Sequence, residues 1–246
     1  NGVHLVGRSF KYHRPRGFLG SGSEEPNAIV QIIKDKARTE PNIRATEIEI
    51  FEGFEAKSQN CWPSVNFDIG EINNLFSPII PAGFYYKTFM WPAKLWKTYE
   101  YFIRKAAGLG VSATQRDPDL YDHKYYHCDI LIVGTGPGGL TAAMVAVNSG
   151  KKVLLVDEKA EHGGSLVGSN GKVVSIDNIE PKEWVKKIYS ELLKNKNIKI
   201  LNRTSVSAYH NYNYLIMMQN LTDHLNENDK KNKIRQRLWK VRAKKV

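Results

Sequence analysis

A glycine-rich segment holds the residues whose types and spacing point most directly to chemistry. Its order is Gly134-Thr-Gly136-Pro137-Gly138-Gly139. Gly134 allows a tight turn, Gly136 lets the backbone approach a diphosphate where a side chain would collide, and Gly139 lets a following helix pack closely on a strand. Unpaired N–H groups at the start of that helix favour negative charge. The segment, with Pro137 and Gly138 included, therefore predicts a dinucleotide-binding loop.

Apolar runs flank this loop and predict the elements that position it. Residues 130–133 are typical of a buried strand, residues 140–149 of a helix ended by a glycine, and residues 153–156 of a second buried strand. Strand, turn, helix and strand within about thirty residues have the length of one mononucleotide-binding βαβ unit. The alternative is a degenerate unit of this kind that holds no ligand.

Two acidic residues follow the second strand. Asp157 comes eighteen residues after Gly139, where a carboxylate accepts hydrogen bonds from an adenosine ribose, and Glu158 is included with it as a cofactor-binding residue. An acid there favours NAD or FAD, because it would repel a 2′-phosphate. Gly164 and Ser165 lie in a later turn whose N–H groups could also meet the phosphates, although an ordinary loop is an equal alternative.

Composition and charge exclude several classes of protein. The chain has 246 residues and a net charge of +11, but residues 230–246 contain nine of its 36 basic residues and no acidic one, so the rest is nearly neutral. We therefore expect no nucleic-acid partner and no membrane partner. Two cysteines in no Cys-x-x-Cys pair fit a reducing, cytoplasmic compartment. We interpret the basic end as an exposed hairpin that enters a strand.

The region before the glycine segment predicts a separate small domain and a connection. Residues 29–33 and the alternating residues 47–51 indicate strands of a small α+β domain over residues 1–92. Residues 93–127 are expected to be an amphipathic helix, ended by Gly108, and an extended linker. Residues 128–246 would then form a partial Rossmann-type domain. Because neither end of the sequence has a start or stop signal, we interpret it as a fragment with both ends truncated.

Other candidate sites are weaker. His123, His127 and Cys128 have a spacing that would suit a metal on a helix, but their surroundings read as extended and no complete ligand set is present. No metal site is therefore predicted, and no catalytic residue is identified. The basic residues between Arg8 and Arg16 are most simply a solvated face. The aromatic residues between 84 and 102 indicate burial against another domain or subunit.

Several longer strings carry a resemblance to a known family. The chain closely resembles alpha subunits of heterotetrameric sarcosine oxidases in the segments Gly7-Arg-Ser-Phe-Lys-Tyr-His-Arg-Pro-Arg-Gly17, Glu24-Glu-Pro-Asn-Ala28, Ala82-Gly-Phe-Tyr-Tyr-Lys-Thr-Phe-Met-Trp-Pro92, Ala106-Ala-Gly-Leu-Gly110 and Tyr121-Asp-His123. The resemblance implies an N-terminal domain with the fold of a [2Fe–2S] ferredoxin-like module that lacks the cluster. Two isolated cysteines agree with this, since such a cluster needs four thiolates.

The same resemblance implies cofactors and partners. NAD would be bound by this chain at Gly134, Gly136, Gly139 and Asp157, while FAD and FMN would belong to the assembled complex. Tetrahydrofolate would bind through a C-terminal domain that this sequence does not contain. The partners would be beta, gamma and delta subunits, and the complex would oxidatively demethylate sarcosine to glycine, with the one-carbon unit going to tetrahydrofolate or formaldehyde and with H2O2 formed.

Two other interpretations remain open. A FAD-dependent oxidoreductase or electron-transfer subunit acting on another amine would carry the same glycine pattern. A non-catalytic assembly module with a vestigial nucleotide site would carry it too. In the sarcosine oxidase interpretation this piece is expected to act as a scaffold, because hydride removal from an amine needs a flavin ring that faces the substrate, and no flavin attachment is recognisable in the sequence.

Overall fold

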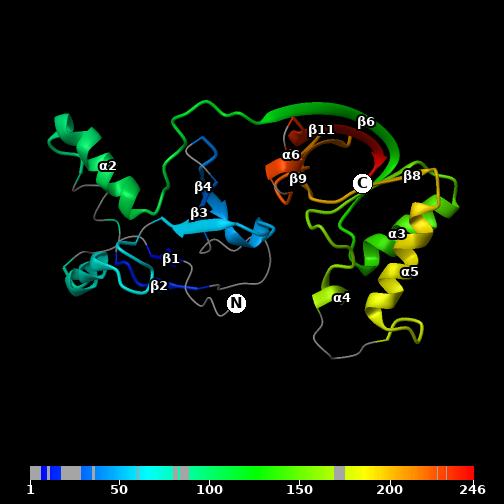
Figure 1. Ribbon diagram of the computed structural model, residues 1–246, viewed down its shortest axis with the longest axis horizontal. Helices are drawn as coiled ribbons and strands as arrows, with labels where there is room; N and C mark the ends of the chain where they lie inside the picture. Colours follow the sequence, from blue (N-terminus) through cyan, green and yellow to red (C-terminus); the bar gives the residue numbers. More distant parts are fainter. Residues whose placement is uncertain are drawn as a thin grey trace. The chain divides into compact units, whose positions relative to one another are not determined.

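The computed structural model describes residues 7–9, 12–17, 29–34, 37–59, 61–79, 83, 89–168, 175–225, 227–230 and 232–246. The chain divides into two compact units, residues 1–118 and residues 119–246, which are described separately. Figure 1 shows the elements of each unit in sequence colours. Among the described residues, no helix combines the length and the apolar character needed to cross a membrane.

The first unit contains two small antiparallel sheets. Strands β1 (Gly7–Arg8) and β2 (Pro15–Arg16) form a hairpin, and a second sheet has the order β4-β3-β5, with β3 (Ile29–Ile33) between β4 (Glu40–Arg44) and β5 (Glu55–Ser58). Val30 and Ile32 supply the buried face of the central strand. Pro41 lies in β4, which is an edge strand where a missing N–H is tolerated.

The predicted strand over residues 47–51 is wrong. Residues Ala45–Glu47 form the 3₁₀ helix η1, and the chain after it has no strand pairing up to Phe51. Ile50 is 74% exposed. Alternation of polar and apolar residues predicts a strand only where a partner strand lies beside it, and β4, just upstream, takes that place against β3.

The predicted helix near residue 100 is confirmed. After the 3₁₀ helices η2 (Ile69–Phe76) and η3 (Ala93–Leu95), the helix α2 covers Trp96–Ala106. Gly108 ends it with φ +78°, donating its N–H to Lys105 O, while Leu109 N–H bonds Arg104 O. A glycine in the left-handed region is the usual residue for such a helix end.

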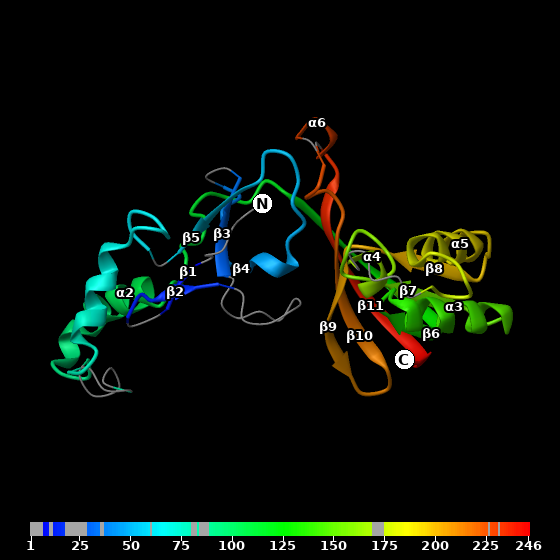
Figure 2. The same ribbon diagram turned by 90° about the horizontal axis from the view of Figure 1, so that it is seen from below.

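The second unit is built on one sheet of six strands. Its order is β8-β7-β6-β11-β10-β9. Strands β6 (Leu120–Val133), β7 (Val153–Val156) and β8 (Ile198–Leu201) are parallel to one another, and β11 (Ile234–Lys245) is parallel to β6. Strand β10 (Tyr214–Asn220) pairs antiparallel with β11, and β9 (Thr204–His210) pairs antiparallel with β10 at the edge of the sheet, as Figure 2 shows.

The prediction of a linker that extends to His127 is wrong for residues 120–127. They are the first part of β6, which runs beside β11 (Figure 1), and the second unit begins at Asp119 rather than at Cys128. Asp122 accepts two hydrogen bonds from Arg237 of β11, at 2.7 and 2.9 Å. The basic end therefore forms a paired strand, and part of its charge is neutralised by ion pairs.

Two helices cover one face of this sheet. Helices α3 (Pro137–Asn148) and α5 (Pro181–Leu193) lie side by side, as Figure 1 shows, and pack on the parallel strands through a core that includes Leu140, Ala143 and Trp184. The short helices α4 (Ser165–Gly168) and α6 (Glu227–Lys230) lie in connecting segments. A second core, which contains Leu131, Met217 and Trp239, lies on the other face. The β6-α3-β7-α5-β8 arrangement is the Rossmann-type fold expected from the sequence.

Candidate functional site

The glycine loop joins β6 to α3 in the predicted way. Gly134 has φ +97°, a region that favours glycine, and its N–H bonds Val156 O at 2.7 Å. An added Cβ at Gly139 would lie 2.0 Å from Gly134 O, so no side chain fits there. The turn and the close helix contact that Gly134 and Gly139 were expected to provide are both present.

Gly136 leaves free space in front of the helix. An added Cβ at Gly136 or at Gly138 would meet no atom within 4 Å. Gly136 is the N-cap of α3, no side chain caps it, and Pro137 occupies the first turn. The N-terminal N–H groups of α3 are thus left for a ligand, and the helix dipole favours an anion there. These features fit the diphosphate of a dinucleotide.

Asp157 lies at the end of β7, but its carboxylate is turned toward the glycine loop. Oδ2 accepts hydrogen bonds from the backbone N–H and the hydroxyl of Thr135, both at 2.6 Å, and Oδ1 accepts from Lys159 N–H at 2.9 Å. Three donors leave little capacity for two ribose hydroxyls. Glu158, the next residue, is exposed. Contact of either acid with a ribose stays a prediction.

Thr135 is a residue that the sequence reasoning did not single out. It is fully buried, and its hydroxyl proton is donated to Asp157. His162 Nδ1 lies 3.3 Å from the hydroxyl oxygen of Thr135. Because the Thr135 hydroxyl donates its proton to Asp157, the proton between His162 and Thr135 must lie on Nδ1 of His162. Burial lowers the pKa of His162, and the charge of Asp157 opposes this shift. The ring of His162 stacks on Tyr189 at 4.2 Å.

This network brings the second glycine pair to the first loop. Gly163 N–H donates to Thr135 O at 2.9 Å, and an added Cβ at Gly164 would lie 3.1 Å from Gly136 Cα. Gly164 is therefore next to the space in front of α3, and Ser165 beside it is exposed. A histidine directly before a glycine pair is the signal that could have pointed to this network.

The weaker candidates lie elsewhere. His123 and His127 lie on the strand β6, where residues four apart are about 13 Å apart, so they cannot form a helical metal pair. No group of three potential metal ligands is found in the described part of the chain. Cys128 is buried, and burial raises the pKa of its thiol to about 11. Of the predicted basic face, Arg8 is buried and forms an ion pair with Glu71.

Comparison with known families agrees with both units. Residues 129–244 match the family of FAD dependent oxidoreductases, and residues 1–61 match the family of 2Fe-2S iron-sulfur cluster binding domains. Sarcosine oxidase subunit alpha from Rhizobium meliloti (strain 1021) is 46% identical over 99% of this chain. The chain is a homologue of sarcosine oxidase alpha subunits. The corresponding subunit from Corynebacterium sp. (strain U-96) is 31% identical over 100% of the chain.

The homologous subunits are much longer than this chain. The chain spans 24% of the Rhizobium meliloti protein and 21% of the Corynebacterium protein. Among solved structures, L-proline dehydrogenase from P. horikoshii matches 99% of this chain and 34% of its own length, with a TM-score of 0.50 and 15% identity, which supports the fold alone. The 2Fe-2S family match does not bring a cluster ligand set, since the whole sequence contains two cysteines.

Proposed function

We propose that this chain is the nucleotide-binding and scaffolding part of the alpha subunit of a multi-subunit, flavin-dependent sarcosine oxidase. The observation that carries the proposal is the free space at Gly136 in front of the uncapped helix α3, in a chain homologous to such subunits. A side chain in place of Gly136 would fill this space. The loop would hold the diphosphate through backbone N–H groups, and the segment after β7, with Asp157 and Glu158, would lie beside the adenosine ribose.

The dinucleotide is proposed to be NAD. FAD is the second candidate, and the match of residues 129–244 to FAD dependent oxidoreductases favours it. Both ligands share the adenosine diphosphate half, which is the part that the glycine loop and the residues after β7 would contact. The loop residues and Asp157 therefore suit either nucleotide. Other residues must contact the nicotinamide or flavin half, in which the two nucleotides differ.

The complete enzyme is proposed to oxidise sarcosine to glycine. The flavins FAD and FMN, when bound in the complex, would supply the two-electron chemistry that oxidises the amine and reduces O2 to H2O2. The oxidised methyl carbon would leave as formaldehyde after addition of water, or pass to tetrahydrofolate. The beta, gamma and delta subunits would supply the remaining parts, in the cytoplasm. A bound dinucleotide would stabilise the folded chain and, if it is reduced and reoxidised, would supply hydride transfer. This chain's own residues would bind and orient it.

Release of the nucleotide from the purified complex tests the proposal. The complex is denatured, the protein is removed, and the soluble nucleotides are separated and identified by mass spectrometry. About one NAD per alpha chain, in addition to the flavins, is the expected result. FAD as the nucleotide of this site would favour a FAD-dependent oxidoreductase arrangement, and no nucleotide beyond the flavins of the other subunits would favour a vestigial site.

A further inference from the structure

A buried histidine–aspartate pair lies in the first unit, where the nucleotide site does not use it. His13 is 8% exposed, and its Nδ1 lies 2.6 Å from Asp68 Oδ2. The other oxygen of Asp68 accepts hydrogen bonds from Trp62 N–H at 2.9 Å and from Gly70 N–H at 3.1 Å. Because both oxygens of Asp68 act as acceptors, Nδ1 carries the proton of this contact, and Nε2 is the ring nitrogen left to meet a ligand.

The charge state of this pair follows from its surroundings. Burial raises the pKa of Asp68, but the hydrogen bonds from Trp62, His13 and Gly70 outweigh burial and hold the pKa below its ordinary value of 3.8. The carboxylate therefore stays ionised across the physiological range. It fixes the tautomer and the orientation of the His13 ring, as a carboxylate partner does for functional histidines.

The backbone around His13 is arranged for this ring. His13 has φ +54°, which is uncommon for a residue other than glycine, and Arg8 donates to its carbonyl at 3.0 Å. An added Cβ at Gly70 would lie 2.4 Å from His13 Nδ1, so glycine is required beneath the ring. Left-handed conformations of this kind occur preferentially at functional sites.

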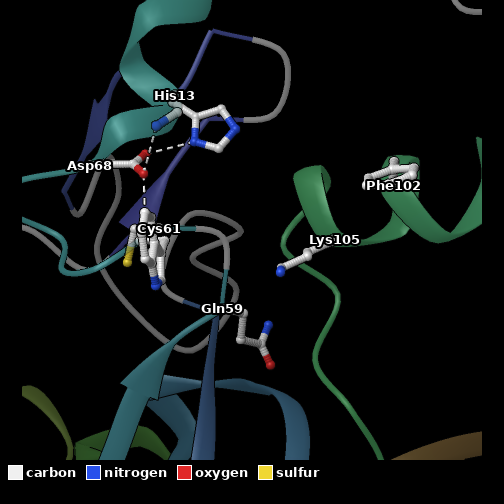
Figure 3. Close-up of a pocket in the computed structure, with 8 residues that line it drawn as sticks. His13, Gln59, Cys61, Asp68, Phe102 and Lys105 are labelled. Carbon is white, nitrogen blue, oxygen red and sulfur yellow. Dashed lines mark hydrogen bonds and ion pairs between the residues drawn. The ribbon is translucent and has the colours of Figure 1, made fainter.

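The pair opens into a cavity of about 230 Å³. Among the described residues, His13 Nε2 makes no hydrogen bond. Figure 3 shows the ring with Nδ1 toward Asp68 and with Nε2 on its far side, and the Lys105 side chain extends from α2 with its amine nearest Gln59. The walls combine this acceptor with one cation, two aromatic rings, a thiol and an amide, from His13, Lys105, Trp62, Phe102, Cys61 and Gln59.

The chemistry of these walls selects a ligand class. Lys105 can hold a carboxylate, Nε2 of His13 can accept an N–H, and the faces of Trp62 and Phe102 attract an ammonium group as well as carbon. The volume lies below the range of about 300–1,000 Å³ typical of pockets for drug-sized ligands. We propose that this cavity binds a small amino-acid zwitterion, with its carboxylate on Lys105 and its ammonium on His13 Nε2.

This proposal is independent of the nucleotide site, because all these residues lie within residues 1–118. The hydrogen bond to Asp68 does not take part in ligand binding, so a variant can keep this bond and still lose the binding. In His13→Asn, the side-chain amide nitrogen can take the place of Nδ1, and asparagine tolerates the left-handed backbone. The variant lacks the second ring nitrogen that would meet the ligand and also the ring carbon Cε1, and it has an amide oxygen in place of Cδ2.

Calorimetric titration of the holoprotein with glycine tests the proposal, with acetate as the probe that lacks the N–H donor. Wild-type protein is expected to bind glycine more tightly than acetate. His13→Asn and Lys105→Met should each weaken glycine binding by about 10-fold or more, at an unchanged melting temperature. Lys97→Met is the matched control, since Lys97 is an exposed lysine on the same helix that does not line the cavity, and it should bind as wild type does.

Specific outcomes would overturn the proposal. Wild-type affinity for glycine in both His13→Asn and Lys105→Met would show that the cavity does not bind it, and so would the absence of any glycine binding. Equal affinities for glycine and acetate would remove the role of Nε2. If His13→Asn lowers the melting temperature, Lys105→Met against Lys97→Met decides alone, because Lys105 lies on the surface of its helix.

Discussion

Two glycines of the same loop are expected to separate nucleotide binding from folding. A Cβ at Gly139 would lie 2.0 Å from Gly134 O, whereas a Cβ at Gly136 would meet nothing within 4 Å. Gly136 has φ −65° and ψ 179°, which any residue adopts. Gly136→Val therefore fits the ligand-free fold, while its side chain takes the space that a diphosphate needs. Gly139→Ala forces the helix and the strand apart.

Gly139→Ala should lower the stability of the fold, whereas Gly136→Val should lower the affinity for the nucleotide. Overpacking costs about 1–3 kcal/mol or more, and the contact at Gly139 is with backbone atoms that cannot rotate away. At about 2–4 °C per kcal/mol, the melting temperature of Gly139→Ala should fall by roughly 2–12 °C. Gly136→Val should keep its ligand-free melting temperature and lose nucleotide affinity by at least about 100-fold, or about 2.7 kcal/mol.

The assay measures nucleotide per chain after gel filtration and, separately, the melting temperature of nucleotide-free protein. The separation is needed because a bound ligand raises the melting temperature by itself. Gly168→Val is the control, since Gly168 also has free space around it but lies outside the loop. Full nucleotide occupancy in Gly136→Val would refute the diphosphate position. An unchanged melting temperature in Gly139→Ala would refute the close packing.

Three further predictions concern single residues. Thr135→Val should lower the free energy of unfolding in urea by about 1–3 kcal/mol, because Asp157 loses a buried donor, and Thr135→Ser should restore most of it; an unchanged value would contradict the network. Asp122→Asn should cost up to about 1 kcal/mol near neutral pH. The hydrogen bond from Arg237 holds the pKa of Asp122 below 3.8, so this stabilisation is present above pH 3.8 and is lost as the pH falls further. The unfolding free energies of wild type and Asp122→Asn should therefore converge in acid. A difference that stays constant with pH would argue against the ion pair. Cys128, whose pKa is about 11, should resist iodoacetamide in the native protein and react after unfolding, as read by peptide mass spectrometry; fast native labelling would disprove its burial.

The sequence by itself determined the elements whose conformation depends on near neighbours. The glycine loop between two apolar runs, the helix α3 after it and the acid at the end of β7 were all predicted from spacing. The end of α2 at Gly108 was predicted as well. Each of these follows from residues within a few positions along the chain, because turns, helix ends and buried strands are encoded by local residue types.

Only the tertiary structure decided the contacts between distant segments. The extension of β6 back to Leu120 depends on β11, and Asp122 and Arg237 are 115 positions apart. His13 meets Asp68 across 55 positions. Neither pair can be predicted from a local pattern, because the sequence contains many acidic residues that could pair with each basic one. Strand register and burial determine which acidic residue lies within hydrogen-bonding distance.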